Sequence, residues 1–201
     1  MGKSTLNLQT YFGDDLHDFP ENPEDFKKFI ELEKQEILNL VGDEKYKRIS
    51  RLAVHYRQLR NYDEAHELFK TASGYFENTK PQMEMVNYLR WGDVFRFEKR
   101  FNEAWDILKK AEQILLTHQF MDYQDFYFQH LGKLFFDKGE YEKAHECFDK
   151  ALALRIEKAN PELISSTEFA LKLPTQKLEN SIPEAFGGVP LLPIKTLLRS
   201  K

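Results

Sequence analysis

An eleven-residue frame recurs three times along the chain at nearly constant spacing. The segment Tyr62-Asp-Glu-Ala-His-Glu-Leu-Phe-Lys-Thr-Ala72 returns as Tyr141-Glu-Lys-Ala-His-Glu-Cys-Phe-Asp-Lys-Ala151, and a weaker copy, Phe101-Asn-Glu-Ala-Trp-Asp-Ile-Leu-Lys-Lys-Ala111, lies between them. The frame steps by 39 residues and then by 40. A fixed period in this range indicates a repeat array, in which each unit stacks on its neighbours to bury one continuous core. This pattern favours an extended binding surface over a single reaction centre.

Turn signals divide residues 44–158 into three pairs of helices. We expect helices at 44–60 and 62–78, at 82–99 and 101–118, and at 122–138 and 141–158. Lys80-Pro81 and Asn160-Pro161 separate the pairs, because proline cannot continue a preceding helix. Asn22-Pro23, followed by two acidic residues, predicts the start of a further helix over 23–43, closed at Gly42. Terminal repeats need a cap, so this helix is expected to cover the edge of the first unit.

The two ends of the chain differ from the repeats. Residues 1–22 are acidic and turn-prone, and we expect them to be irregular. A partial fourth unit over 161–173 is expected to end at Pro174 and to cap the far end. Segment 174–201 combines prolines and glycines with an apolar run from Pro183 to Leu198. This tail has three interpretations: it caps the array, it fills the groove of its own chain, or it docks on a partner or a second copy.

At these positions the chain resembles the tetratricopeptide repeat family. That family places a large residue, a Leu-Gly pair, an aromatic, a turn glycine, a second aromatic, Ala, Phe and Ala along each helix pair. The small residues permit close helix approach and the aromatics fill the gaps. The third unit (125–160) matches with Phe128, Leu131, Gly132, Phe135, Gly139, Tyr141, Ala144, Phe148 and Ala151; the second (85–124) with Tyr88, Trp91, Gly92, Phe95, Phe101, Ala104, Leu108 and Ala111; the first (46–84) with Ile49, Leu52, Ala53, Tyr56, Tyr62, Ala65, Phe69 and Ala72.

The resemblance implies an all-α fold: a right-handed solenoid of three helix pairs, with a capping helix at each end. The usual period of the family is about 34 residues, so these units are longer. Units of such length are similar to those of kinesin light chains and of bacterial peptide-sensing regulators. The implied function is a non-enzymatic scaffold or adaptor that binds a peptide or protein segment in its concave groove. The alternative is a peptide-responsive signalling regulator whose solenoid changes curvature on binding.

In this family the first helix of each pair lines the concave face. Matching those positions gives a mixed surface, in which arginines can hold carboxylates and aromatics can seat an apolar side chain. We therefore expect a partner segment of acidic and apolar character. The alternative is a solvated face whose arginines pair with neighbouring acids. The predicted groove residues are Lys47, Arg51, Arg57, Arg90, Asp93, Arg96, Phe97, Phe126, Gln129, His130, Lys133 and Phe136, together with Ser50, Val54, Val86, Leu89 and Asp137.

No catalytic, metal-binding or cofactor-binding motif emerges from the chain. His66 and His145 each precede a glutamate, but a metalloprotease helix needs a second histidine four residues later, where Lys70 and Asp149 stand. His145 and Cys147 lie two residues apart and therefore point to different sides of a helix. Both histidines are explained as repeat positions. We expect no catalytic residues, no metal and no cofactor.

Charge and cysteine content constrain partners and location. The net charge of −4 produces no strong field toward nucleic acid or an anionic membrane. No long apolar run predicts a signal peptide or a membrane span. Cys147 is the only cysteine, which suits a reducing compartment. We therefore expect a cytoplasmic protein that binds neither nucleic acid nor membrane and that self-associates, if at all, through its C-terminal tail.

Overall fold

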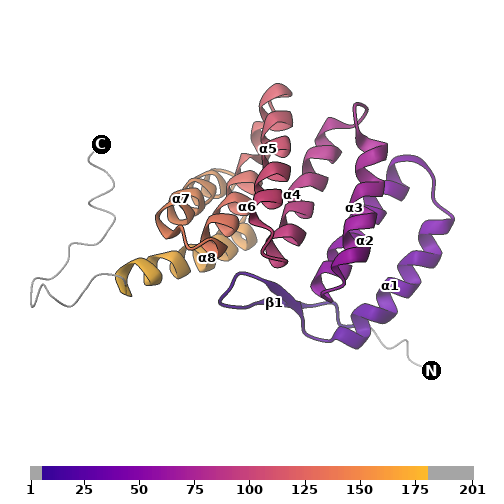
Figure 1. Cartoon of the computed structure of the whole chain (residues 1–201), viewed down its shortest axis with the longest axis horizontal. Coiled ribbons are helices and arrows are strands. Elements are labelled where there is room, and N and C mark those ends of the chain that lie inside the picture. Colours follow the sequence, from indigo (N-terminus) through magenta and orange to yellow (C-terminus); the bar gives the residue numbers. More distant parts are fainter. Residues whose placement is uncertain (1–5, 181–201) are drawn as a thin grey trace, which may run out of the picture.

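The computed structural model describes residues 6–180, which form a curved row of α-helices (Figure 1). Each helix packs mainly against its neighbours in sequence, and α4 also contacts α2 and α6. The all-α repeat architecture predicted from the sequence is confirmed. The helices are α1 (Pro23–Leu38), α2 (Gly42–Gln58), α3 (Tyr62–Phe76), α4 (Pro81–Phe97), α5 (Phe101–Thr117), α6 (Gln124–Asp137), α7 (Tyr141–Glu157) and α8 (Pro161–Asn180), with a 3₁₀ turn, η1 (Met121–Tyr123), before α6.

The turns inside the three helix pairs share one backbone geometry. Arg60, Lys99 and Gly139 stand at equivalent positions and have φ values of 66°, 60° and 76°. The amide that follows each of them donates to a carbonyl five residues earlier, as in a Schellman-type helix end. Only the third unit has the glycine that adopts this conformation without strain. The first helix of each pair therefore ends at the same position of the repeat.

Small residues at one repeat position bring the two helices of each pair into contact. Ala53, Gly92 and Gly132 occupy this position in the three units. A Cβ atom at Gly132 would lie 2.6 Å from the ring of Phe148, and one at Gly92 would lie 3.0 Å from Leu108. The alanines of the recurring frame are all fully buried: Ala65, Ala104 and Ala144 at its first alanine position, and Ala72, Ala111 and Ala151 at its second.

The first helix begins as expected but ends earlier. The Asn22 side chain accepts a hydrogen bond from the Asp25 amide at 3.2 Å and caps α1. The helix ends at Leu38, and Gly42 begins α2 instead of closing α1. The left-handed φ of 60° at Gly42 turns the chain between these helices. The expected boundary at Gly42 marked the right turn but assigned the glycine to the wrong helix.

The expectation that Pro174 ends the last helix was wrong. The last helix, α8, continues through Pro174 to Asn180. Proline removes one helical hydrogen bond, but Pro174 is buried here, and burial of its ring favours continuation of the helix. The apolar tail from Pro183 to Leu198 lies outside the described residues, so its three interpretations remain predictions.

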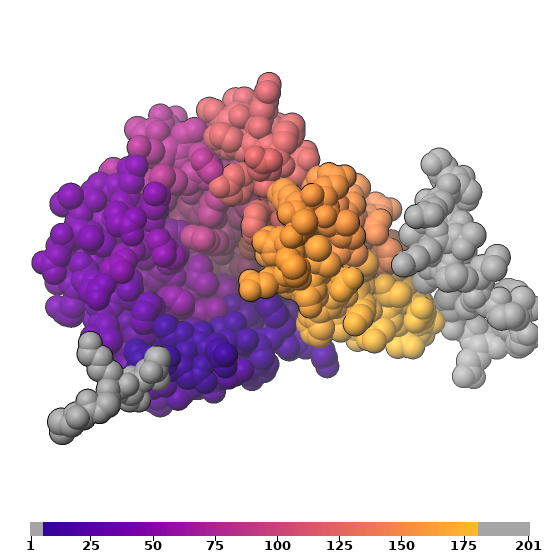
Figure 2. Space-filling model, turned by 180° about the vertical axis from the view of Figure 1, so that it is seen from behind, coloured from indigo at the N-terminus to yellow at the C-terminus, as the bar shows by residue number. Residues whose placement is uncertain are grey.

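The expectation of a largely irregular segment over 1–22 missed a β-hairpin. Within it, β1 (Thr10–Phe12) and β2 (Asp18–Pro20) pair antiparallel, with Tyr11 opposite Phe19. Three-residue strands are too short to show an alternating pattern, and a two-stranded hairpin is at best marginal on its own. This hairpin instead packs on the helices. It lies across the lower part of the hollow face, from the side of α1 and α2 toward α8 (Figures 1 and 2).

Candidate protein-binding surface

The repeat places α2, α4 and α6 side by side, and we call the surface that they share the concave face. The twelve predicted groove residues all lie on these three helices. The structure separates them into two parts. The closed part contacts the N-terminal hairpin or the residues that hold it: Arg57, Asp93, Arg96, Phe97, Lys133 and Phe136. The open part lines cavities between the helices: Lys47, Arg51, Arg90, Phe126 and His130. Phe126 and His130 lie at the border with the closed part, where His130 is 3.3 Å from Asp93. Gln129 belongs to neither part and is buried against Arg155.

Leu16, in the turn of the hairpin, is the apolar anchor of the closed part. Its side chain is 1% exposed and clusters with Phe136, Ala144, Phe148 and Ala170. These partners belong to α6, α7 and α8. Full burial of a leucine side chain contributes about 2 kcal/mol. Leu16 thus ties the N-terminal segment to the C-terminal end of the array.

Asp18 is the acidic anchor of the same segment. Its carboxylate lies 2.8 Å from two nitrogens of Arg57, with Nη2 donating to Oδ2 and Nη1 close to Oδ1. Gln58 Nε2 donates to Oδ2 at 2.6 Å. Arg57 and Asp18 are both buried, so solvent screens their attraction little. One predicted groove arginine therefore holds a carboxylate of its own chain.

Arg96 is the centre of a second buried polar network. Its side chain is 1% exposed. Its guanidinium donates to Asp93 at 3.2 Å, to Asp137 at 2.7 Å and to the Leu16 carbonyl at 3.1 Å. These donations link α4, α6 and the hairpin turn. Arg96 is a structural residue of the closed part and is not exposed to a partner.

Aromatic contacts complete the closed part. The ring of His17 stacks on that of Phe97, with centroids 3.8 Å apart and an interplanar angle of 14°. His17 Nε2 also lies 3.3 Å from Asp137 Oδ2. The Lys133 ammonium stands 5.3 Å from the centroid of the Phe12 ring. These groove residues, predicted to bind acidic and apolar side chains of a partner, contact the hairpin of their own chain instead.

The pKa of Asp18 lies below its usual value. Burial opposes ionisation, but the charges of Arg57 and Lys133 and the hydrogen bond from Gln58 outweigh it. The pKa of Asp93 is lowered further: burial again opposes ionisation, and His130, Lys133 and Arg96 outweigh it. Both carboxylates are therefore charged at neutral pH, and the hairpin is held by ionic contacts as well as by Leu16.

Acidification should weaken the docking of the hairpin. A carboxyl group with a depressed pKa in the folded state stabilises that state above its unfolded pKa of about 4, and this contribution is lost as the pH falls through the folded value. At neutral pH, Asp18→Asn should reduce the free energy of unfolding by about 3 kcal/mol, because Arg57 keeps its buried charge without this counterion. The difference between wild type and Asp18→Asn should shrink below about pH 4. Urea denaturation of both proteins over a pH series measures this difference in the free energy of unfolding. A difference that does not depend on pH would contradict a stabilising role for the charged Asp18 carboxylate.

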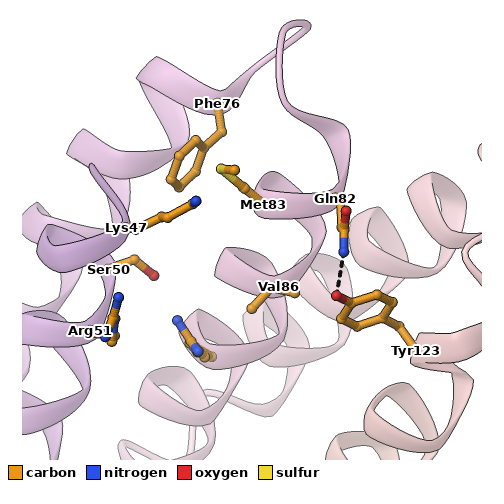
Figure 3. A pocket seen from close by; sticks show the side chains of 9 residues that line it. Lys47, Ser50, Arg51, Phe76, Gln82, Met83, Val86 and Tyr123 are labelled. Atoms are coloured by element: carbon orange, nitrogen blue, oxygen red, sulfur yellow. Dashed lines mark hydrogen bonds between the residues drawn. The ribbon is translucent and has the colours of Figure 1, made fainter. Parts of the chain in front are cut away.

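The open part contains a cavity of about 530 Å³ between α2, α4 and η1 (Figure 3). A second cavity, of about 430 Å³, adjoins it and shares Val86, Arg90 and Tyr123. Gln82 and Tyr123 are hydrogen-bonded to each other at the rim. The first cavity is lined by Lys47, Ser50, Arg51, Phe76, Gln82, Met83, Val86, Arg90 and Tyr123; Leu89, Phe126 and His130 complete the second.

Arg90 joins the two cavities. Among residues 6–180 it makes no ion pair within 4.0 Å, and it is half-buried. Burial and then the charge of Arg51 lower the pKa of its guanidinium from the usual value. Arg51 is exposed, and its nearest carboxylate, on Glu44, is 3.9 Å away. A pair this exposed and this long contributes little, so the cavity retains an excess of positive charge.

Sequence reasoning placed Lys47, Ser50, Arg51, Val86, Leu89 and Arg90 on this face but missed part of the wall. Phe76, Met83 and Tyr123 come from the joints between units, which the first-helix rule does not cover. The apolar residues on either side of Pro81 were the sequence signal that could have indicated this part of the wall. Gln129, also predicted, is buried and accepts a hydrogen bond from Arg155 at 3.1 Å.

His66, one of the residues weighed for catalysis, has structural partners. Trp91 Nε1 donates to His66 Nδ1 at 2.7 Å, and His66 Nε2 lies 2.6 Å from Glu98. Burial raises the pKa of the Cys147 thiol to about 11, so this group is protonated at neutral pH. In the part of the chain that the structure describes, no cluster of His, Cys, Asp or Glu has the arrangement of a metal site. Nor is any helix there long and apolar enough to cross a membrane.

Comparison with known sequences assigns the repeat. Residues 126–157, which lie in α6 and α7, match a sequence model of the tetratricopeptide repeat. This match identifies the third helix pair as a tetratricopeptide repeat. No curated protein matches the chain.

Comparison with solved structures supports the fold over most of the chain. The crystal structure of BtubC (BKLC) from P. vanneervenii is similar, with a TM-score of 0.59 and 18% sequence identity. The similarity covers 84% of this chain and 80% of BtubC. At this identity the likeness concerns the fold alone.

Proposed function

We propose that this protein is a non-enzymatic interaction scaffold that binds a segment of a partner protein at the open part of its concave face. The observation that carries the proposal is the pair of adjoining cavities around Arg90, where three cations meet apolar walls. Concave surfaces of repeat arrays are their usual binding surfaces. Cavities of a few hundred Å³ with a small number of converging polar groups are typical of ligand sites.

The closed part supports the expected chemistry of the partner. On the same face, the hairpin presents an aspartate to Arg57 and a leucine to an apolar cluster. An acidic and apolar segment therefore complements this kind of surface. The open part carries similar residue types, with Arg51 and Arg90 beside Met83 and Val86. We place the scaffold in the cytoplasm, in keeping with the free and buried Cys147.

The alternative, a regulator that changes curvature on binding a peptide, has less support. Such a device needs the units to move relative to one another. The hairpin contacts α2 through Asp18, α4 through His17 and α8 through Leu16. A segment that bridges separate units opposes a change of curvature. A rigid scaffold agrees better with these contacts.

Replacing Arg90 with glutamate should abolish capture of the partner. Reversing a partly buried charge at the centre of the binding surface is expected to weaken binding by about 100-fold. Affinity capture from native lysate, read by mass spectrometry, compares wild type, Arg90→Glu and Arg100→Glu. Arg100 is the matched control, because it is an exposed arginine outside both cavities and is paired with Glu103. A partner lost with Arg90→Glu and retained with Arg100→Glu is the expected result.

Equal capture by all three proteins would move the interaction away from the open part. The convex surface and segment 174–201 would then be the remaining places for a partner. Arg96→Glu is unsuitable for this experiment, because Arg96 is buried and its substitution disturbs the fold.

A further inference from the structure

The cavity between α2 and α4 combines three basic side chains with no acidic one. Lys47, Arg51 and Arg90 contribute to its lining, which contains neither aspartate nor glutamate. Phe76, Met83 and Val86 supply the apolar part. Elsewhere on the concave face, Arg57 and Arg96 each have a buried carboxylate partner. The open cavity thus collects three cations, and the long, exposed contact between Arg51 and Glu44 is their only ion pair among the described residues.

Holding these cations close together is unfavourable without a counter-charge. Arg51 and Arg90 are close enough for the charge of one to lower the pKa of the other. Burial of Arg90 adds to this effect. Like charges in a partly desolvated site repel each other more strongly than in water. An anion that enters the cavity removes this repulsion, so binding energy is available there for an anion in particular.

Ser50 provides an independent sign of a ligand. Its side chain is 2% exposed, and its hydroxyl has no hydrogen-bond partner. In Figure 3 this oxygen points from α2 into the cavity, between Lys47 and Arg51. Buried hydroxyl groups are nearly always paired, because an unpaired one loses its hydrogen bonds to water. A bound acceptor in the cavity would satisfy the Ser50 hydroxyl.

We propose that this cavity binds a dianionic oxyanion attached to an apolar group, namely a phosphorylated side chain of the partner segment. A phosphomonoester carries about two negative charges and three strong acceptor oxygens at neutral pH. Its charge matches three cations better than the single charge of a carboxylate, and its oxygens match the donors of Arg51, Arg90 and Ser50. The apolar wall then contacts the rest of the partner side chain. This assignment rests on the proposed function and specifies its ligand.

Two small probes test the proposal on the full chain. Phenyl phosphate presents the dianion on an aromatic ring, and benzoate presents a single negative charge on the same ring. In isothermal titration calorimetry at neutral pH and low salt, phenyl phosphate should bind saturably. Benzoate should bind at least about ten-fold more weakly, because charge-assisted hydrogen bonds to a dianion are more numerous and stronger. Equal affinity for the two probes would overturn the choice of a phosphate.

Variants locate the site. Arg90→Gln should weaken phenyl phosphate binding by at least about ten-fold, and Ser50→Ala by about three-fold, as expected for a charged and a neutral donor. Arg100→Gln should leave binding unchanged. If Arg90→Gln fails to fold, the exposed Arg51 supplies Arg51→Gln as a substitute. Ser50→Ala should leave the melting temperature unchanged or raise it, since it removes an unpaired buried hydroxyl.

The outcomes separate this proposal from the proposed function. The phosphate site would be overturned if phenyl phosphate did not bind saturably. It would also be overturned if Arg90→Gln and Arg51→Gln bound phenyl phosphate as tightly as the wild type. Partner capture that still depended on Arg90 would then leave the scaffold function standing with a ligand of different chemistry. Saturable binding that depends on Arg90, together with a loss of Arg90-dependent capture after phosphatase treatment of the lysate, would support both.

Discussion

Replacing Arg96 with alanine should destabilise the protein by about 3–5 kcal/mol, the cost of removing one member of a buried charge network. Asp93 and Asp137 would keep their charges in the interior without this partner, and the Leu16 carbonyl would lose its donor. Because domains of this size are stable by only about 5–15 kcal/mol, such a loss removes a large fraction of the stability. Urea denaturation followed by circular dichroism measures it.

Arg100→Ala is the matched control for this prediction. Arg100 follows α4, its side chain is 45% exposed, and it pairs with Glu103 at the surface. Its substitution should change stability by no more than about 0.5 kcal/mol. Similar losses from the two substitutions would show that the buried network does not stabilise the fold as we expect.

Replacing Leu16 with alanine should cost about 2–5 kcal/mol and release the hairpin from the helices. Leu16 is the only hairpin residue in the cluster formed with Phe136, Phe148 and Ala170. Its truncation leaves a cavity that the rigid helices cannot close. Its backbone φ of 58° is left-handed for leucine and alanine alike, so the substitution tests packing and not backbone strain.

Hydrogen exchange reports the release of the hairpin directly. The amides of Gly13 and Glu21 donate to His17 and Gln9 within the hairpin, and both should exchange faster in Leu16→Ala. Leu38→Ala is the control, because Leu38 is 71% exposed and contributes little to the core. Unchanged exchange at Gly13 and Glu21 would mean that Asp18 and His17 hold the hairpin without the leucine anchor.

These contacts divide the concave face into parts with different roles. The hairpin closes one part through buried contacts that the fold needs for stability. The other part keeps Lys47, Arg51 and Arg90 beside open cavities. The proposed partner segment therefore contacts about half of the surface that is assigned to binding when the first helix of every pair is taken to line the groove. Variants aimed at binding belong in the open part, where Arg51 is exposed and Arg90 is half-buried.

The helix pairs could be predicted from the sequence because packing repeats with the chain. Ala65, Ala104 and Ala144 recur at the period of the units and are fully buried in all three. Residues at one repeat position meet the same neighbours, so one pattern read three times identifies helices, turns and core together. Arg60 and Lys99 adopt the left-handed turn conformation of Gly139 although they are not glycine. Their equivalent positions in the repeat still identify them as turn residues.

The hairpin and the division of the groove could not be predicted in this way. Asp18 meets Arg57, 39 residues further on, and His17 meets Asp137, 120 residues further on. Such short strands have little stability of their own, so local sequence carries no sign of them. Arg57, Arg90 and Arg96 are the same residue type on one face. Whether each is buried and paired or free to bind depends on where an unrepeated segment lies, and only the tertiary structure decides that.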